Sequence, residues 1–419
     1  MSLPGPILVV SENRDRGLAG ALAAAGSSAI IEKPLAEAAT TIARETPAAV
    51  VFADADITPT QSMADAITDA IDAAPAPFMP VLARLNDCGA TIMDVLPINA
   101  AAPPEQIVAR LAAALRVRTL HATVLRRIDT LRHNGADVPD LPSTDPLEEA
   151  TILVTGRGRS YPLLSAAVSE RVGLIGALSV ENAARHLNGR EVDGVILGEG
   201  FGPATNAAFL TALTEDSRFR DLPVGIVPDI PPGIDRKRLS GLEAVHGEPE
   251  DIVAHLLPLV RLHAFETRLR RHVATLDARG LIDPQTGLST ITAFERRLPR
   301  TIADARERGV PVSIARFVLP FGLGERSRID AARLVSRLIR AIDFACQSED
   351  GAITVVFAEQ ALRQAHVVAR RIAAIMRQTV LEPRGSELEA VVTLACLKSA
   401  DNAQTLLARV CETSTKAAE

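Results

Sequence analysis

The chain has 419 residues, of which 47% are hydrophobic and 23% charged, enough apolar material for two or three independent cores. A net charge of -6, one Tyr, no Trp and no basic run argue against a dedicated nucleic-acid surface. The apolar runs are short and the chain shows no charged-then-apolar leader, which predicts a cytoplasmic protein without membrane insertion. The four cysteines are scattered and indicate neither a metal site nor a disulfide scaffold: Cys88, Cys346, Cys396 and Cys411.

The first 133 residues alternate short apolar runs with helical stretches. Buried strands are predicted at 7–10, 49–52 and 79–82. This alternation indicates a parallel sheet with helices on both faces, as in a flavodoxin-like domain. The pattern returns in residues 150–278, with strands predicted at 151–154, 194–197 and 222–227. A repeat of this length indicates a duplicated domain.

A long helix is predicted to close each of these domains. The first runs from Pro104 to Arg132 and is followed by a polar linker at 134–149; the second runs from Ile252 to Leu276. Such helices pack on their own sheet or carry dimer contacts. Packing on the domain's own sheet is favoured for the N-terminal half of each helix.

Residues 279–419 have a different pattern. Strands are predicted at 311–319 and 389–396, helices at 329–342 and 362–376, and a hairpin at 345–357. Paired strands between helices predict an α+β or α/β domain with a partly antiparallel sheet. This is the outline of a nucleotidyl-cyclase-like fold.

The two N-terminal domains resemble CheY-like receiver domains of response regulators. The resemblance implies an acidic pair for magnesium, a phosphoacceptor aspartate and a lysine. The matching residues are Ser11-Glu12, Ala53 and Leu96 in the first domain, and Gly156-Arg157, Gly198 and Glu248 in the second. Both receivers are therefore expected to be degenerate. Asp54 and Asp56 lie near the acceptor position, so Asp54 stays open as a phosphoacceptor, against the alternative of a turn aspartate.

The last domain resembles the GGDEF domain of diguanylate cyclases, through Asp283-Pro284-Gln285-Thr286-Gly287-Leu288 followed by Phe294. Those enzymes need two carboxylates to hold metal ions. The resemblance places them at Val318 and Gly351, and the signature itself at Glu349, Asp350, Gly351, Ala352 and Ile353. No metal and no catalysis are therefore expected. Asp350-Gly351 is also a two-residue hairpin signal.

Arg340 and Asp343 match the Arg-x-x-Asp inhibitory site at which this family binds cyclic di-GMP. The motif occurs four more times in the chain, so its position before the hairpin is what gives it weight. Both side chains are expected on the surface at the end of a helix, with Arg371, or its neighbour Arg370, as the second arginine. Arginine can donate to guanine O6 and N7, and a carboxylate can accept from guanine N1–H and N2–H.

Two receivers before a GGDEF domain give the layout of PleD-type response regulators, and a lost catalytic motif beside a kept inhibitory site resembles the PopA-type degenerate members. The resemblance implies a cyclic di-GMP effector that is no enzyme, forms a homodimer, lies at a cell pole and delivers the cell-cycle regulator CtrA to the ClpXP protease through RcdA. Two alternatives stay open: a structural dimerisation scaffold that binds no nucleotide, and a response regulator driven by residual phosphorylation.

Overall fold

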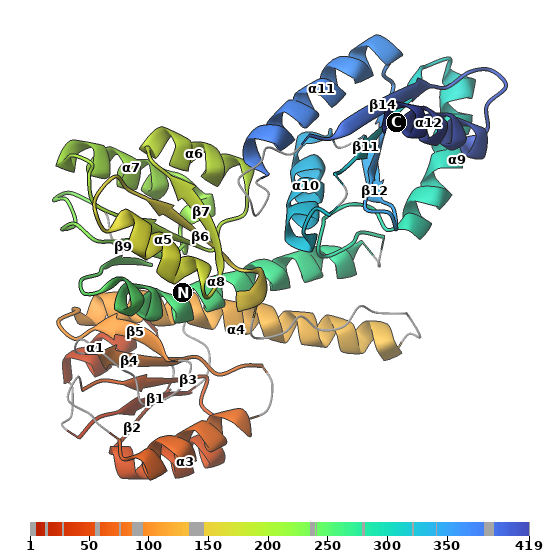
Figure 1. Ribbon diagram of the computed structural model, residues 1–419. Coiled ribbons are helices and arrows are strands. Elements are labelled where there is room, and N and C mark those ends of the chain that lie inside the picture. Colours follow the sequence, from red (N-terminus) through yellow and green to blue (C-terminus); the bar gives the residue numbers. More distant parts are fainter. Residues whose placement is uncertain are drawn as a thin grey trace. The chain divides into compact units, whose positions relative to one another are not determined.

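The computed structural model describes residues 6–12, 16–26, 29–54, 59–74, 77–85, 95–133, 146–234, 239, 241–278, 281–320, 322–340, 342–380 and 389–418 (Figure 1). The chain divides into two compact units. One comprises Met1–Thr130, Leu141–Leu187 and Glu191–Leu269, and the other Leu131–Asp140, Asn188–Arg190 and Arg270–Glu419.

The first unit opens with a five-stranded parallel sheet in the order β2-β1-β3-β4-β5. This is the flavodoxin-like strand order. Three of its strands contain residues of the apolar runs predicted at 7–10, 49–52 and 79–82, because a parallel sheet is covered on both faces. The elements are β1 (Pro6–Val10), α1 (Arg16–Ala24), β2 (Ala29–Lys33), η1 (Leu35–Glu37), α2 (Ala38–Glu45), β3 (Ala49–Phe52), α3 (Gln61–Asp72), β4 (Val81–Leu85), β5 (Leu96–Asn99) and α4 (Pro104–His133).

A second parallel sheet in the same unit has the order β10-β9-β8-β6-β7, which is the same topology read from the other edge. The two sheets of this unit therefore have equivalent strand orders. Its elements are η2 (Leu147–Glu149), β6 (Thr151–Thr155), α5 (Tyr161–Ser169), β7 (Gly173–Ala177), α6 (Val180–Gly189), β8 (Gly194–Leu197), α7 (Pro203–Glu215), η3 (Ser217–Phe219), β9 (Val224–Ile226), β10 (Leu242–Ala244) and α8 (Pro249–Asp277).

The two sheets share one hydrophobic core, to which both α4 and α8 contribute. A buried ion pair joins them: Arg110 Nη2 on α4 lies 2.6 Å from Glu243 Oε1 on β10, and each side chain is 4% exposed. Arg110 Nη1 also donates to the carbonyl oxygen of Pro97 on β5 at 2.6 Å. The closing helices thus make part of their contacts with the other domain of the same chain.

The second unit contains a four-stranded sheet in the order β12-β13-β11-β14, in which every neighbouring pair is antiparallel. The sequence of elements from β11 to β14 is β-α-β-β-α-β, the split βαβ arrangement. The elements are α9 (Ile291–Arg308), β11 (Val312–Val318), α10 (Glu325–Leu338), β12 (Phe344–Gln347), β13 (Ile353–Ala358), α11 (Leu362–Thr379), β14 (Val391–Cys396) and α12 (Ala403–Ala418).

Two local expectations are wrong here. The sheet of the second unit is antiparallel throughout its named strands, whereas the sequence predicted a partly antiparallel one. Helix α10 ends at Leu338, four residues before the predicted end. The apolar spacing continues to Ile342, but that side chain is 47% exposed and lies outside the helix.

Some sequence predictions fall outside the described residues, namely those on Cys88, Asp56 and most of the 134–149 linker. Among the helices that are described, none is both long enough and apolar enough to cross a membrane.

Candidate functional site

The segment between α10 and β12 brings Arg340 and Asp343 together. After Leu338 the chain turns away from the helix, because Ile339 takes an extended conformation with ψ of 153°. The Asp343 carboxylate then accepts the Arg340 backbone N–H at 3.3 Å. This bond between a side chain and a nearby main chain competes with helix continuation.

Asp343 is buried rather than exposed as predicted: its side chain is 1% exposed. Besides the Arg340 backbone, it accepts from Arg340 Nε at 3.0 Å, from Arg340 Nη2 at 2.9 Å and from the Ala358 N–H at 3.0 Å. Both carboxylate oxygens therefore have two donors each. A carboxylate has about four acceptor positions, so Asp343 has no lone pair left for another donor.

Arg340 differs from its partner, because its side chain is 48% exposed. Its Nη2 also donates to the Ala358 carbonyl oxygen at 2.7 Å. With the amide of Gln360 turned to face it, the Gln360 oxygen accepts from Nη2 at 2.6 Å and Nε at 3.0 Å. The hydrogen bonds to Asp343 raise the pKa of Arg340 above its ordinary value. Within the described part of the chain, Nη1 has no acceptor, so two donors of a fixed guanidinium remain available.

Arg371 lies on the exposed side of α11, next to the buried residues that anchor this helix, and Arg370 is exposed too. No described residue forms a hydrogen bond or an ion pair with Arg371. Helix α11 starts at Leu362, two residues beyond Gln360, and Arg371 is about 14 Å further along the axis at 1.5 Å per residue. Arg371 is thus not part of the Arg340–Asp343 hydrogen-bond network.

The hairpin between β12 and β13 occupies the other end of these strands from Arg340. Gly351 N–H donates to the Ser348 carbonyl oxygen at 2.8 Å, and Ser348 N–H donates to the Ala352 carbonyl oxygen at 2.9 Å. Gly351 has a φ of +80°. The centre of the turn is therefore Glu349-Asp350, with Gly351 in the left-handed position that follows it, and the predicted two-residue Asp350-Gly351 turn is wrong.

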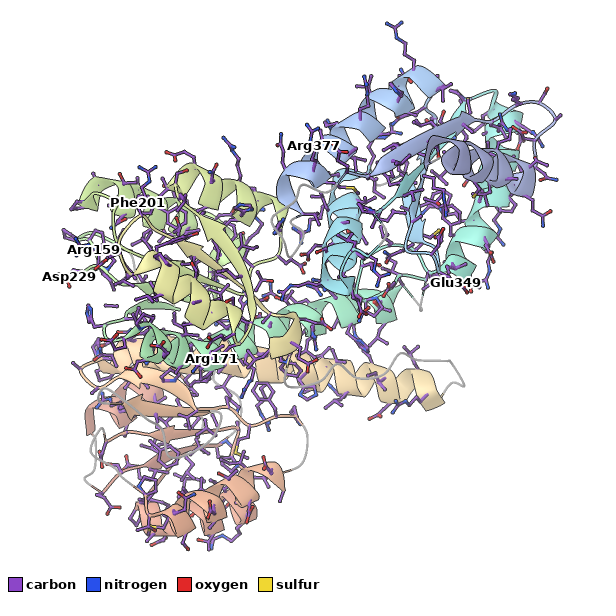
Figure 2. The ribbon with its side chains drawn as sticks, in the orientation of Figure 1. Arg159, Arg171, Phe201, Asp229, Glu349 and Arg377 are labelled. Carbon is purple, nitrogen blue, oxygen red and sulfur yellow. The ribbon has the colours of Figure 1, made fainter. Side chains whose placement is uncertain are left out.

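A guanidinium binds the hairpin tip beside Gly351, one of the two positions where the resemblance implies a metal ligand. Arg316 on β11 is 12% exposed and forms an ion pair with Asp350 at the tip. It also donates to Ser348 Oγ at 3.3 Å. Val318, two residues further along β11, supplies no polar group. No set of three or more possible metal ligands is present among the residues that the structure describes. Glu349 is exposed at this tip (Figure 2).

The first flavodoxin-like sheet gathers polar groups at the carboxyl ends of β1 and β3, where such sheets bind ligands. Ser11 Oγ donates to Asp54 at 2.8 Å, and the Glu12 N–H donates to the same carboxylate at 2.7 Å. Glu12 in turn accepts the Leu35 N–H at 3.0 Å. The predicted acceptor position, Ala53, is fully buried. The structure thus brings Asp54 beside the Ser11-Glu12 pair.

The equivalent crevice of the second sheet is closed by its own loops. The Arg157 and Gly158 N–H groups both donate to the Glu199 carbonyl oxygen, at 2.8 and 3.1 Å. Ser160 Oγ donates to the Glu199 carboxylate at 3.0 Å. A Cβ on Gly198 would lie 3.3 Å from the Thr155 carbonyl oxygen, so the backbones meet directly. Arg159 and Phe201 extend from this end of the domain (Figure 2).

No family model matches the sequence, and no curated protein matches it. The structural neighbours of this chain are GGDEF domains. The coiled coil and GGDEF domain of DgcB from Caulobacter crescentus, in complex with c-di-GMP, is 18% identical, covers 36% of this chain and 86% of its own, and has a TM-score of 0.32. The PA1120 GGDEF domain from Pseudomonas aeruginosa is 19% identical, with coverage of 32% and 91% and a TM-score of 0.30.

The FimX GGDEF domain from Pseudomonas aeruginosa is similar in the same way: 17% identity, coverage of 33% and 93%, and a TM-score of 0.30. These likenesses are low in identity and cover about a third of the chain. Function therefore has to be inferred from the residues of this chain.

Three contributors to the site were missed at the sequence level. Gln360 and the Ala358 carbonyl hold Arg340, and Arg316 holds the hairpin tip. The strand pairing that places Arg316 opposite Thr354 is set by the sheet register, which no short motif encodes. An arginine inside a predicted buried strand was the one available signal, since arginine is rarely buried without a partner.

Proposed function

We propose that this chain is a non-catalytic receptor for cyclic di-GMP that contacts its ligand through Arg340. The observation that carries the proposal is the state of this guanidinium, which is held on one edge by Asp343 and Ala358 and exposed on the other. The two Nη1 donors can bond guanine O6 or N7, or a phosphate oxygen. In this proposal Asp343 positions Arg340 and does not accept from guanine.

We infer that the chain has no cyclase activity from the residues at the hairpin and on β11. Joining two nucleoside triphosphates needs carboxylates that hold metal ions. Val318 and Gly351 carry none, and Arg316 neutralises Asp350 at the tip. Incubation with GTP and magnesium should therefore give no cyclic di-GMP. Measurable product from the purified chain would overturn this part of the proposal.

Isothermal titration calorimetry with cyclic di-GMP tests the receptor claim. We expect binding by the wild type and at least tenfold weaker binding by Arg340→Ala, with melting curves to verify that the variant is folded. The matched control is Arg218→Ala, which removes an arginine from another Arg-x-x-Asp motif in a different unit, where Arg218 pairs with Asp216. Unchanged affinity for Arg340→Ala, or no binding by the wild type, refutes the claim.

Arg371 is proposed as a second contact, made by a partner protomer. Because no described residue holds it, Arg371→Ala should leave the melting temperature unchanged and weaken only the complex that contains two protomers. Sedimentation velocity with and without cyclic di-GMP measures this. The neighbour Arg370→Ala is the control.

A second candidate function is a structural scaffold that binds no nucleotide. One observation favours it: Asp343 is buried and fully bonded, as expected of a group that holds a turn. The scaffold predicts no calorimetric signal with cyclic di-GMP and a dimer that is insensitive to it. Calorimetry with cyclic di-GMP, together with sedimentation with and without it, separates the two candidates.

The adaptor role at a cell pole, with RcdA, CtrA and ClpXP as partners, is proposed from the family resemblance. It requires that cyclic di-GMP strengthens the interaction of this chain with purified RcdA. Pull-down of RcdA by the wild type and by Arg340→Ala, each with and without the ligand, tests it. Equal capture in all four samples would exclude a ligand-dependent adaptor.

A further inference from the structure

A cavity of about 440 Å³ lies in the second unit, between α9 and the segment that precedes it. The residues that give it its chemistry are Leu281, Ile282, Ser289, Arg296, Arg297 and Arg300. None of the described residues that line it is acidic. Cavities of 300–1,000 Å³ are the size that holds small organic ligands.

The three arginines face the cavity because of their spacing on α9. Arg296 and Arg297 lie three and four residues after Ala293, and Arg300 lies four and three residues after these two, which places all four along one face of the helix. The opposite face is the core face, made of Phe294, Leu298, Ile302 and Ala305. The sequence of α9 thus separates an apolar anchoring face from a cationic face.

The wall opposite the arginines is formed by a hydrogen-bonded loop. Ile282 and Ser289 form an antiparallel bridge. The Asp283 N–H donates to the Leu288 carbonyl oxygen at 2.8 Å, and the Ser289 N–H donates to Ala345 at the same distance, which ties the loop to β12. Leu281 is 46% exposed. A pre-formed wall with exposed apolar groups reduces the ordering cost of binding.

The guanidinium groups differ in how they are held. Arg297 is fixed: its Cζ lies 4.2 Å from the centre of the Phe344 ring, and its Nη2 donates to the Ile342 carbonyl oxygen at 3.2 Å. Arg296 and Arg300 form no hydrogen bond and no ion pair with any residue that the structure describes. Three neighbouring cations without an acid repel one another, and an anion would relieve that repulsion.

We propose that this cavity binds a small organic phosphate with a flat apolar body, of the mononucleotide class. Arginine forks bond phosphate oxygens in pairs, which suits Arg296 and Arg300. Leu281, Ile282 and Ala293 provide the apolar surface against which a base or similar ring packs. Arg340 and the partners that bond its side chain do not line the cavity, so the proposal does not depend on the proposed binding of cyclic di-GMP.

Calorimetric titration of the full chain with GMP, AMP and inorganic phosphate tests the site. We expect GMP or AMP to bind at least tenfold more tightly than inorganic phosphate, and Arg296→Ala/Arg300→Ala to weaken that binding at least tenfold. The charge-matched control is Arg159→Ala/Arg185→Ala, two exposed arginines of the other unit, which should bind like the wild type. Arg296 and Arg300 are both exposed, so the double variant should melt at the wild-type temperature.

Four results would overturn the proposal. One is no heat of binding with any of the three compounds at millimolar concentration. Another is equal affinity in the wild type and in Arg296→Ala/Arg300→Ala. A third is loss of mononucleotide binding in Arg340→Ala, which would assign the nucleotide to the other site. The last is binding of inorganic phosphate as tightly as GMP, because the apolar wall would then play no part and the proposed ligand class would be wrong.

Discussion

Asp343 shows how one buried side chain can determine the meaning of a short motif. Four N–H groups converge on its carboxylate, three of them from Arg340. The Arg-x-x-Asp spacing alone predicted two surface groups side by side. The structure divides their roles: the carboxylate organises the turn, and the arginine meets the solvent.

Substitution of Asp343 by Asn should lower the free energy of unfolding by about 1–3 kcal/mol, because buried hydrogen bonds to a charged group are lost. Urea denaturation monitored by circular dichroism measures it. Asp216→Asn, at an exposed ion pair with Arg218, is the control and should change little. An unchanged free energy of unfolding in Asp343→Asn would mean that the turn is held by other contacts.

His121 on α4 makes part of the protein's stability dependent on pH. It is 3% exposed, its Nδ1 accepts the Phe78 N–H at 3.3 Å, and its ring packs edge-on against Phe265 on α8. Burial, followed by the charge of Arg118, lowers the pKa of His121 below its ordinary value. The folded protein therefore resists protonation at a ring nitrogen that already serves as an acceptor.

The unfolded chain takes up this proton near pH 6.5 and the folded chain does not, so stability is fully present above that pH and falls as the pH drops. The slope is at most about 1.4 kcal/mol per pH unit for one group. Denaturation at pH 7.5 and 5.5 should show a smaller loss for His121→Phe than for the wild type. Some pH-dependent loss of stability should remain in His121→Phe, because burial also lowers the pKa of His272. Equal losses would contradict this role of His121.

At the scale of elements, the β12–β13 hairpin keeps its geometry through Gly351. Its φ of +80° favours glycine, and a Cβ there would lie 3.3 Å from Arg328 Cδ. We expect Gly351→Ala to cost about 1–2 kcal/mol. Gly351→Asn should cost less, because Asn enters the left-handed region more readily. Thermal unfolding of the two variants compares them, and equal melting temperatures would show that backbone conformation is not the cause.

Much of the element pattern could be predicted from the sequence. Apolar runs such as 7–10 and 194–197 located strands because a parallel strand is buried on both faces. The end of α10 was missed because Ile339 and Ile342 continue its apolar spacing, while the bond from Arg340 N–H to Asp343 that turns the chain has no periodic signature. Arg316 was missed for a related reason, since its partner Asp350 is brought near only by the sheet.

On the scale of the first unit, a buried ion pair between Arg110 and Glu243 connects the two flavodoxin-like domains. Arg110 and Glu243 are removed from water together, and each depends on the other for neutralisation. A buried pair is costly to break and often replaceable as a whole. The parts of α4 and β10 that carry Arg110 and Glu243 are therefore buried within the first unit.

Glu243→Gln should lower the free energy of unfolding by about 3 kcal/mol, and the double variant Arg110→Met/Glu243→Met should recover most of that loss. A double-mutant cycle by chemical denaturation gives the coupling energy. Glu37→Gln, at the exposed Lys33–Glu37 pair, is the control and should cost less than about 0.5 kcal/mol. A double variant as unstable as Glu243→Gln would indicate that the charges are required as such.

The antiparallel strand order of the second unit also affects how this unit folds during synthesis. The β12–β13 hairpin forms from neighbouring residues, but β11 is completed only when β14 arrives, with Val318 paired to Val391 and Ser313 to Cys396. Closure of so long a loop is slow compared with hairpin formation. During synthesis, the β14 side of β11 would stay an open edge until β14 has been added, and this interval is when the unit is most exposed to wrong pairing and to chaperones.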